Sequence, residues 1–246
     1  MTAKRENLLS SAVVMGVAAL KASKVLLTVG TMLVSMGVYS LIWGWRFAAG
    51  FVLLILIHEM GHYVAARQKG LNVGAPTFIP FVGAWINLKE TPMDVETESY
   101  VAFAGPLAGT LGAVACLFLG GYYGSDLLLA LAYSGFIINL FNLIPVSPLD
   151  GGRITAIVSP RVWLLGAPLL LALFYYWRSP ILILIAILAA PQVMRALRYD
   201  PRAPENVAYY GTSLATKIGY GTLYIGLAAA LAVLSYDVHA SLPSYR

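Results

Sequence analysis

Two histidines and a glutamate stand close together in the run His58-Glu59-Met60-Gly61-His62. On a helix, residues four apart share a face, so both imidazoles can bind a single metal ion. Glu59 lies about 100° round the helix from His58, so its carboxylate can reach a water on that metal without being a ligand. This H-E-x-x-H arrangement is typical of zinc hydrolases.

A hydrolytic zinc site normally has three protein ligands and leaves the fourth position to water. The single cysteine excludes a thiolate cluster, and the third histidine, His239, lies beyond the last apolar segment on the opposite predicted face. Asp150 is the better third ligand, because prolines and glycines around it break the helix and let a carboxylate turn inward. An Asp-Gly-Gly turn is also typical of a helix cap. The need for a third ligand favours coordination.

The elements that position these residues belong to a membrane protein. The chain has 246 residues, of which 59% are hydrophobic and 11% charged, against roughly 45–50% and about 25% in soluble domains. A soluble core of this size cannot hide that much apolar surface. The net charge of +5 is dispersed over loops rather than gathered on one face, so no nucleic-acid partner is expected.

Most of the apolar segments approach the ~20 residues that a spanning helix needs. Two of them are short, Val162–Trp177 and Ile181–Met194, and either span twice or form a hairpin that dips into the membrane. The sequence therefore predicts an all-α polytopic membrane protein with about 5–7 transmembrane helices. The other five segments are Val25–Trp45, Phe47–Ala66, Tyr100–Tyr123, Leu127–Leu149 and Leu214–Leu234.

Two motifs make the chain resemble the site-2 proteases, which are intramembrane zinc metalloproteases. The first is H-E-x-x-H on one span, and the second is N-x-x-P-x-x-x-L-D-G, here Asn142 to Gly151 near the end of a later span. The resemblance covers Phe47–Arg153. It implies one zinc ion per chain held by His58, His62 and Asp150, with Glu59 as the catalytic carboxylate.

The same resemblance implies that Asn142 contacts the substrate backbone or the developing oxyanion. The alternative is that the Asn142 amide breaks the helix and donates hydrogen bonds to nearby backbone carbonyl oxygens. The chain departs from the family at Gly109, where many relatives have asparagine. Gly105, Gly109 and Ala108 with Gly112 form a small-residue surface that favours close helix packing.

The segment Asn72–Leu88 is too apolar for a watery loop and too rich in glycine and proline for a helix. It predicts a short re-entrant β-like strand pair beside the zinc site, since non-helical backbone at membrane depth needs protein or a wet cavity around it. The resemblance implies that it presents substrate as an added strand, with Ala84, Trp85, Ile86 and Asn87 as substrate-binding residues. An interfacial anchor held by Phe78, Phe81 and Trp85 is the alternative.

Lysine and arginine are sorted unevenly between the predicted loops. Thirteen of the sixteen fall in one set of alternate loops, which predicts that the amino terminus and the active site face the cytoplasm of a cell membrane. The expected organisation is a cytoplasmic interfacial segment at 1–24, a transmembrane protease domain at 25–235 with its core at 47–153, and a carboxyl-terminal tail at 236–246.

These observations predict an intramembrane zinc metalloprotease that cleaves peptide bonds in or next to transmembrane segments of membrane-protein substrates within the lipid bilayer. Such an activity serves regulated intramembrane proteolysis. The alternative is a metal-ion transporter or channel that uses the same His/Glu/Asp cluster, since ionisable residues inside membranes also line ion pathways. A transporter usually has two similar halves, and only one span here carries histidines.

Overall fold

The computed structural model describes residues 26–74, 76–81, 83–85 and 94–242. The predicted interfacial segment 1–24 lies outside these residues, and so do Ile86 and Asn87. Five of the described helices are long and apolar enough to cross a membrane. They are Leu26–Trp43, called here the first helix, α2 (Trp45–Gln68), α3 (Val95–Tyr123), α7 (Pro180–Leu197) and α9 (Leu214–Ser241). The predicted helical, polytopic membrane fold is confirmed.

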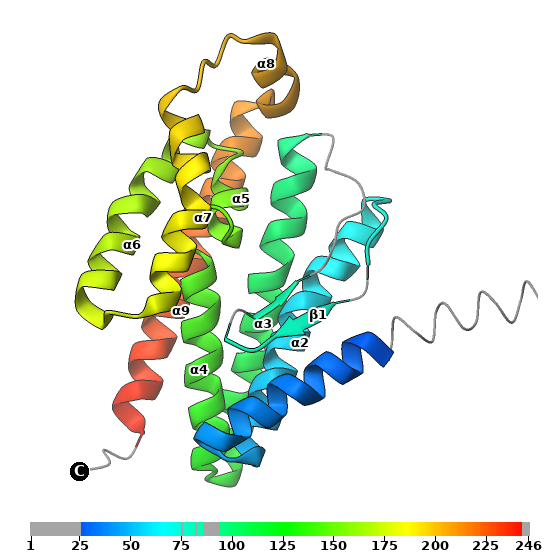
Figure 1. Cartoon of the computed structure of the whole chain (residues 1–246), viewed down its shortest axis with the longest axis vertical. Helices are drawn as coiled ribbons and strands as arrows, with labels where there is room; N and C mark the ends of the chain where they lie inside the picture. The colour runs from blue at the N-terminus through cyan, green and yellow to red at the C-terminus, as the bar shows by residue number, and fades with distance from the viewer. Residues whose placement is uncertain (1–25, 75, 82, 86–93, 243–246) are drawn as a thin grey trace, which may run out of the picture.

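Shorter elements connect these helices. Two are apolar helices, α4 (Asp126–Asn142) and α6 (Trp163–Trp177), and α6 runs beside α7 in Figure 1. The others are α5 (Asp150–Thr155), the 3₁₀ turn η1 (Pro160–Val162) and α8 (Pro204–Tyr210). By length alone, α7 qualifies as a span and the 17-residue α4 does not.

Two helix ends differ from the sequence prediction by seven residues. The fourth segment ends at Asn142 rather than Leu149, because Pro145 and Pro148 cannot donate the backbone hydrogen bonds that a continued helix requires. The last helix runs to Ser241 rather than Leu234, since Val238 packs into the core and keeps the chain helical. The predicted tail at 236–246 therefore begins inside α9.

Local sequence signals explain where the helices begin. The Asp94 carboxylate accepts a hydrogen bond from the Thr97 N–H at 2.7 Å and caps α3, and Ser213 caps α9 through the Thr216 N–H at 3.0 Å. Gly44 joins the first helix to α2 with a φ of 81°, a conformation that side chains other than glycine rarely adopt.

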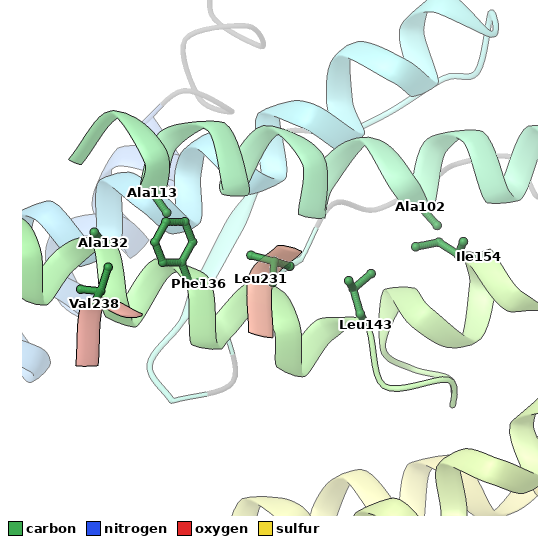
Figure 2. Packing of buried hydrophobic residues seen from close by; sticks show 8 residues of the cluster. All are labelled: Ala102, Ala113, Ala132, Phe136, Leu143, Ile154, Leu231 and Val238. Carbon is green, nitrogen blue, oxygen red and sulfur yellow. The ribbon is translucent and has the colours of Figure 1, made fainter. Parts of the chain in front are cut away.

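The principal core lies where α3, α4, α5 and α9 meet. Phe136 of α4 is fully buried between small residues such as Ala113 of α3, and Leu231 and Val238 of α9 close the cluster (Figure 2). At the other end of this cluster Ile154 of α5 packs near Ala102 of α3. Burial of these side chains fixes α5, the short helix that begins at Asp150, against α3.

A two-stranded antiparallel hairpin follows α2. Strand β1 (Thr77–Ile79) pairs with β2 (Gly83–Trp85), and Phe78 stands opposite Ala84. Figure 1 shows the hairpin lying across α2 and α3, with the first helix running obliquely beside it. The predicted strand pair after the histidine-bearing helix is confirmed.

Candidate metal centre

The middle of α2 carries the paired histidines into the protein interior. His58 and His62 lie one helical turn apart and are buried, although α2 is an apolar helix. Gly61 allows α3 to approach on the same side, because a Cβ there would lie 2.3 Å from the Ala104 carbonyl oxygen. The two helices therefore pack almost backbone to backbone beside the histidines.

Asp150 reaches the histidines because the chain folds back sharply after α4. A Cβ on Gly151 would lie 2.2 Å from the Leu143 carbonyl oxygen, and one on Gly152 would lie 2.2 Å from the Ser147 nitrogen. Only glycine permits this close return of the chain onto the preceding turn. The glycines that follow Asp150 thus hold its carboxylate against α2.

Three ligand atoms converge at this point. The Nε2 atoms of His58 and His62 lie 3.1 Å apart, and Asp150 Oδ2 lies 3.1 Å from the first and 3.3 Å from the second. A tetrahedral zinc ion with ligands at about 2.0 Å places those ligands roughly 3.3 Å from one another. The separations therefore match three corners of a zinc tetrahedron.

The outer ring nitrogens determine the tautomer of both histidines. Nδ1 of His62 donates to the Val101 carbonyl oxygen at 2.8 Å, and Nδ1 of His58 donates to Asn139 Oδ1 at 2.8 Å. The Asn139 amide is itself oriented, because its Nδ2 donates to the Gly135 carbonyl oxygen at 2.7 Å. Both Nε2 atoms therefore present lone pairs.

Two imidazole lone pairs and a carboxylate oxygen thus face each other without a donor between them. Such a set of acceptors is repulsive unless a cation occupies the space that they share. His58, His62 and Asp150 also form the group of potential metal ligands found among the described residues. The donor chemistry and the spacing both fit a zinc ion.

Two glycines of α3 make room for this arrangement. A Cβ on Gly105 would lie 2.2 Å from His62 Nε2, and one on Gly109 would lie 2.4 Å from Asn139 Oδ1. At Gly109, where the sequence departs from many site-2 proteases, the space holds the Asn139 carboxamide. The glycine surface that predicts helix packing therefore also accommodates the metal ligand and its hydrogen-bond partner.

Glu59 lies beside the cluster without joining it. The residue is 8% exposed, and its carboxylate interacts electrostatically with His58, His62 and Asp150. Within the described ranges the Glu59 carboxylate makes no hydrogen bond. It is therefore free to act on a molecule that enters the site.

The other predicted site residues have different surroundings. Asn142 is the half-buried last residue of α4, and its side chain forms no hydrogen bond with any residue that the structure describes. Ala84 and Trp85 lie in β2, which contacts α2. Ile86 and Asn87 fall outside the described part of the chain.

The first helix holds the hairpin by side-chain hydrogen bonds. Thr28 Oγ1 donates to the Pro76 carbonyl oxygen at 2.6 Å, and Thr31 Oγ1 accepts from the Phe78 N–H at 3.1 Å. Tyr39 Oη accepts from the Phe81 N–H at 2.9 Å. Because the Phe78 N–H points away from β2, the outer edge of β1 is already occupied.

The sequence motifs do not point to Asn139, which the structure places as the hydrogen-bond partner of His58. It lies one turn before Asn142, inside an otherwise apolar helix. A buried amide in such a helix marks a functional position by default, and that signal could have identified it. The Val101 carbonyl carries no comparable sequence signal, because any residue supplies a backbone oxygen.

Fold and site together define a polytopic helical membrane protein with a His-His-Asp metal centre. Residues 46–125 match the family model described as Peptidase family M50. The chain is 31% identical over 128 residues to "Zinc metalloprotease MJ0392" of Methanocaldococcus jannaschii, covering 50% of this chain and 37% of that protein. The resemblance to the site-2 protease family that the two motifs predict is confirmed.

Two further similarities extend the comparison. The chain is 27% identical over 180 residues to "Probable zinc metalloprotease EGY2, chloroplastic" of Arabidopsis thaliana, covering 51% of this chain and 32% of that protein. A solved structure, "Site-2 Protease from Methanocaldococcus jannaschii", matches 68% of this chain and 85% of that chain with a TM-score of 0.45 and 21% identity. The chain spans about a third of the length of these two curated relatives.

Proposed function

We propose that this protein is an intramembrane zinc metalloprotease that hydrolyses peptide bonds in or next to transmembrane segments of other proteins. The observation that carries the proposal is the convergence of three lone-pair donors with zinc spacing inside a bundle of membrane-spanning helices. Glu59, buried beside them with no partner among the described residues, supplies the proton-transfer group.

His58, His62 and Asp150 would hold a zinc ion, which would supply a Lewis acid for the scissile carbonyl and would lower the pKa of water to about 7. The Glu59 carboxylate accepts the proton of the attacking water and then delivers it to the nitrogen of the leaving amine. Asn139 and the Val101 carbonyl hold both imidazoles in the tautomer that this chemistry requires. Asn142, at the end of α4, contacts the substrate backbone or the developing oxyanion.

The hairpin provides an edge for an extended substrate. Since the Phe78 N–H points toward the first helix, Phe78 and Ala84 form a pair that is not hydrogen-bonded to each other, and the N–H and C=O of Ala84 point away from β1. The outer edge of β2, on the strand that contacts α2, is therefore the edge to which a substrate strand adds.

The charged ends of the helices support the predicted orientation. Arg67 lies in the last turn of α2 and Arg153 lies in α5. Arg46 lies in the first turn of α2, at its other end, and Arg178 caps the carboxyl end of α6. Positive residues are retained on the cytoplasmic face of a membrane. The amino terminus and the metal centre therefore face the cytoplasm of a cell membrane. The protease domain around the core 47–153 extends past residue 235 to the end of α9, because Val238 packs into the core.

The function is tested with Glu59→Gln in the full chain. The amide has nearly the same volume but cannot accept a proton, so we expect unchanged zinc content and loss of cleavage of a tagged transmembrane substrate. Glu205→Gln, an exposed glutamate of α8, is the matched control and should cleave normally. Zinc is measured by elemental analysis and cleavage by the size of the tagged fragment.

Two results contradict the proposal. Near-normal cleavage by purified Glu59→Gln would remove Glu59 from the reaction. Metal flux through vesicles that contain the intact protein, altered by Glu59→Gln and unaccompanied by cleavage, would instead establish the transporter alternative.

A further inference from the structure

A second polar site lies at the end of α7, apart from the metal centre. A cavity of about 480 Å³ opens there between α7, η1 and α8. Its walls include Trp163, Arg195, Arg198, Tyr199, Asn206 and Tyr210. This volume is in the range of small-molecule sites, about 300–1,000 Å³.

The cavity is cationic. Arg195 lies in the last turn of α7 and Arg198 is the residue that caps this helix, and both side chains line the same cavity. Within the described ranges neither side chain forms a hydrogen bond or an ion pair. Arg161 lies nearby, donating to the Tyr199 carbonyl oxygen at 3.3 Å with its guanidinium 5.9 Å from the Tyr199 ring centroid.

Acidic side chains do not neutralise this site. The residues that line the cavity include no aspartate or glutamate. Glu98 interacts electrostatically with Tyr210, but its two oxygens already accept hydrogen bonds from Arg153 at 3.2 Å and from Tyr209 at 2.5 Å. The Asp200 carboxylate accepts from the Arg202 N–H. The two arginines therefore lack a counter-ion in the described structure.

Basic residues in the last turn of a helix also favour its dipole, and exposed arginines often face only solvent. Arg195 and Arg198 differ from such surface arginines because both line one cavity. Two guanidinium forks set against tryptophan and tyrosine rings suit a phosphate group, which they can bind through paired hydrogen bonds. Asn206 adds an amide to the same space.

The position in the fold identifies the source of the phosphate. The cavity lies at the end of a membrane-spanning helix, and Figure 1 shows α8 beyond the ends of α7 and α9. Side chains at this level meet lipid headgroups, and basic pockets between spanning helices bind anionic ones. We propose that this cavity binds the phosphate headgroup of an anionic phospholipid through Arg195 and Arg198.

One residue of the cavity wall, Trp163, also contacts α5, the helix that positions Asp150. The indole N–H of Trp163 donates to the Gly152 carbonyl oxygen at 2.7 Å, and Gly152 belongs to α5, the helix that begins with Asp150. A bound headgroup therefore packs against the residue that anchors α5.

The site is tested on the full chain in detergent with three probes: short-chain phosphatidylglycerol, diacylglycerol of the same chain length, and inorganic phosphate. Native mass spectrometry counts the bound lipid. Phosphatidylglycerol should bind, and Arg195→Gln with Arg198→Gln should weaken its binding about 10- to 30-fold. The control Arg202→Gln with Lys217→Gln removes the same charge outside the cavity lining and should change binding only a few-fold.

Three outcomes overturn the proposal. Equal binding of diacylglycerol would show that the phosphate is not recognised, and equal occupancy by inorganic phosphate would make this a free-phosphate site. If the cavity variant and the control variant weakened lipid binding equally, the loss would be due to surface charge and not to the cavity. If the double glutamine variant fails to fold, the double variant Arg195→Lys with Arg198→Lys is used instead. It keeps the positive charge but lacks the planar guanidinium groups that bind phosphate with paired hydrogen bonds, so it should still weaken binding.

Discussion

The first helix and α3 are both apolar and long enough to span a membrane, but they are packed very differently. In the most apolar part of α3, 39% of the residues are buried, against 11% in the first helix. Glycines of α3 make room for the His62 ring of α2 and the Asn139 side chain of α4, whereas the first helix is joined to the hairpin by three side-chain hydrogen bonds. The inner helix therefore supports the metal centre, and the outer helix supports the proposed substrate edge.

The largest expected effect on zinc affinity and cleavage comes from a substitution at Gly105. In Gly105→Ala the new Cβ needs the space of the His62 ring, and that ring cannot both move away and remain a ligand. We expect loss of a ligand to lower zinc affinity by more than about 100-fold and to abolish cleavage. Gly121→Ala makes the same change in the same helix where the Cβ meets no atom within 4 Å, and it should keep zinc. Stoichiometric zinc in Gly105→Ala would contradict the role assigned to the inner helix.

Asn139 should have the next largest effect. Asn139→Leu keeps a similar volume but leaves the buried Nδ1–H of His58 without an acceptor. Loss of such a partner typically weakens metal binding about 10- to 100-fold. Asn139→Asp retains an acceptor and should restore most of the affinity, measured by zinc competition with a chelator. If leucine and aspartate behaved alike, the hydrogen bond would not determine the affinity.

The residues of the metal centre, in the inner part of the protein, could largely be predicted from the sequence for physical reasons. His58 and His62 are local in sequence, so helix periodicity alone brings them together. Asp150 required a tertiary argument, the need for a third ligand, and the structure brings it within 3.1 Å of His58. Asn139 was overlooked because its role depends on the crossing of α2 and α4, a relation that periodicity within one helix does not contain.

The contacts of the hairpin and of the basic cavity, in the outer part of the protein, were harder to predict. Glycine and proline in Asn72–Leu88 indicate a broken strand pair, and β1 and β2 confirm it. Which edge is occupied depends on Thr31, a residue of another helix, and a hydroxyl in an apolar span does not reveal its partner. The basic cavity was equally inaccessible, because α7, η1 and α8 meet only after folding.

A proline at Ala84 tests the outer edge of β2 directly. The Ala84 N–H points away from β1, so Ala84→Pro removes a docking donor while leaving the hairpin bonds in place. We expect cleavage to fall about 2- to 10-fold, the value of one hydrogen bond, with zinc content unchanged. Ala84→Gly keeps the donor and is the control. Normal cleavage by Ala84→Pro would favour the interfacial-anchor interpretation of the segment.

The smallest effect is expected at the contact between the first helix and the hairpin. Thr31→Val keeps the side-chain shape and removes the hydroxyl that accepts the Phe78 N–H. The hairpin keeps its bonds to Thr28 and Tyr39, so it should shift rather than detach, and cleavage should fall only about twofold with zinc retained.

Ser40→Ala is the control for Thr31→Val. It also removes a hydroxyl from the first helix, but among the described residues the Ser40 hydroxyl bonds only to the Gly37 carbonyl oxygen within that helix. It should therefore leave cleavage unchanged. A loss of zinc in Thr31→Val would show that the outer helix also supports the metal centre, because a change confined to the hairpin edge cannot reach His58, His62 or Asp150.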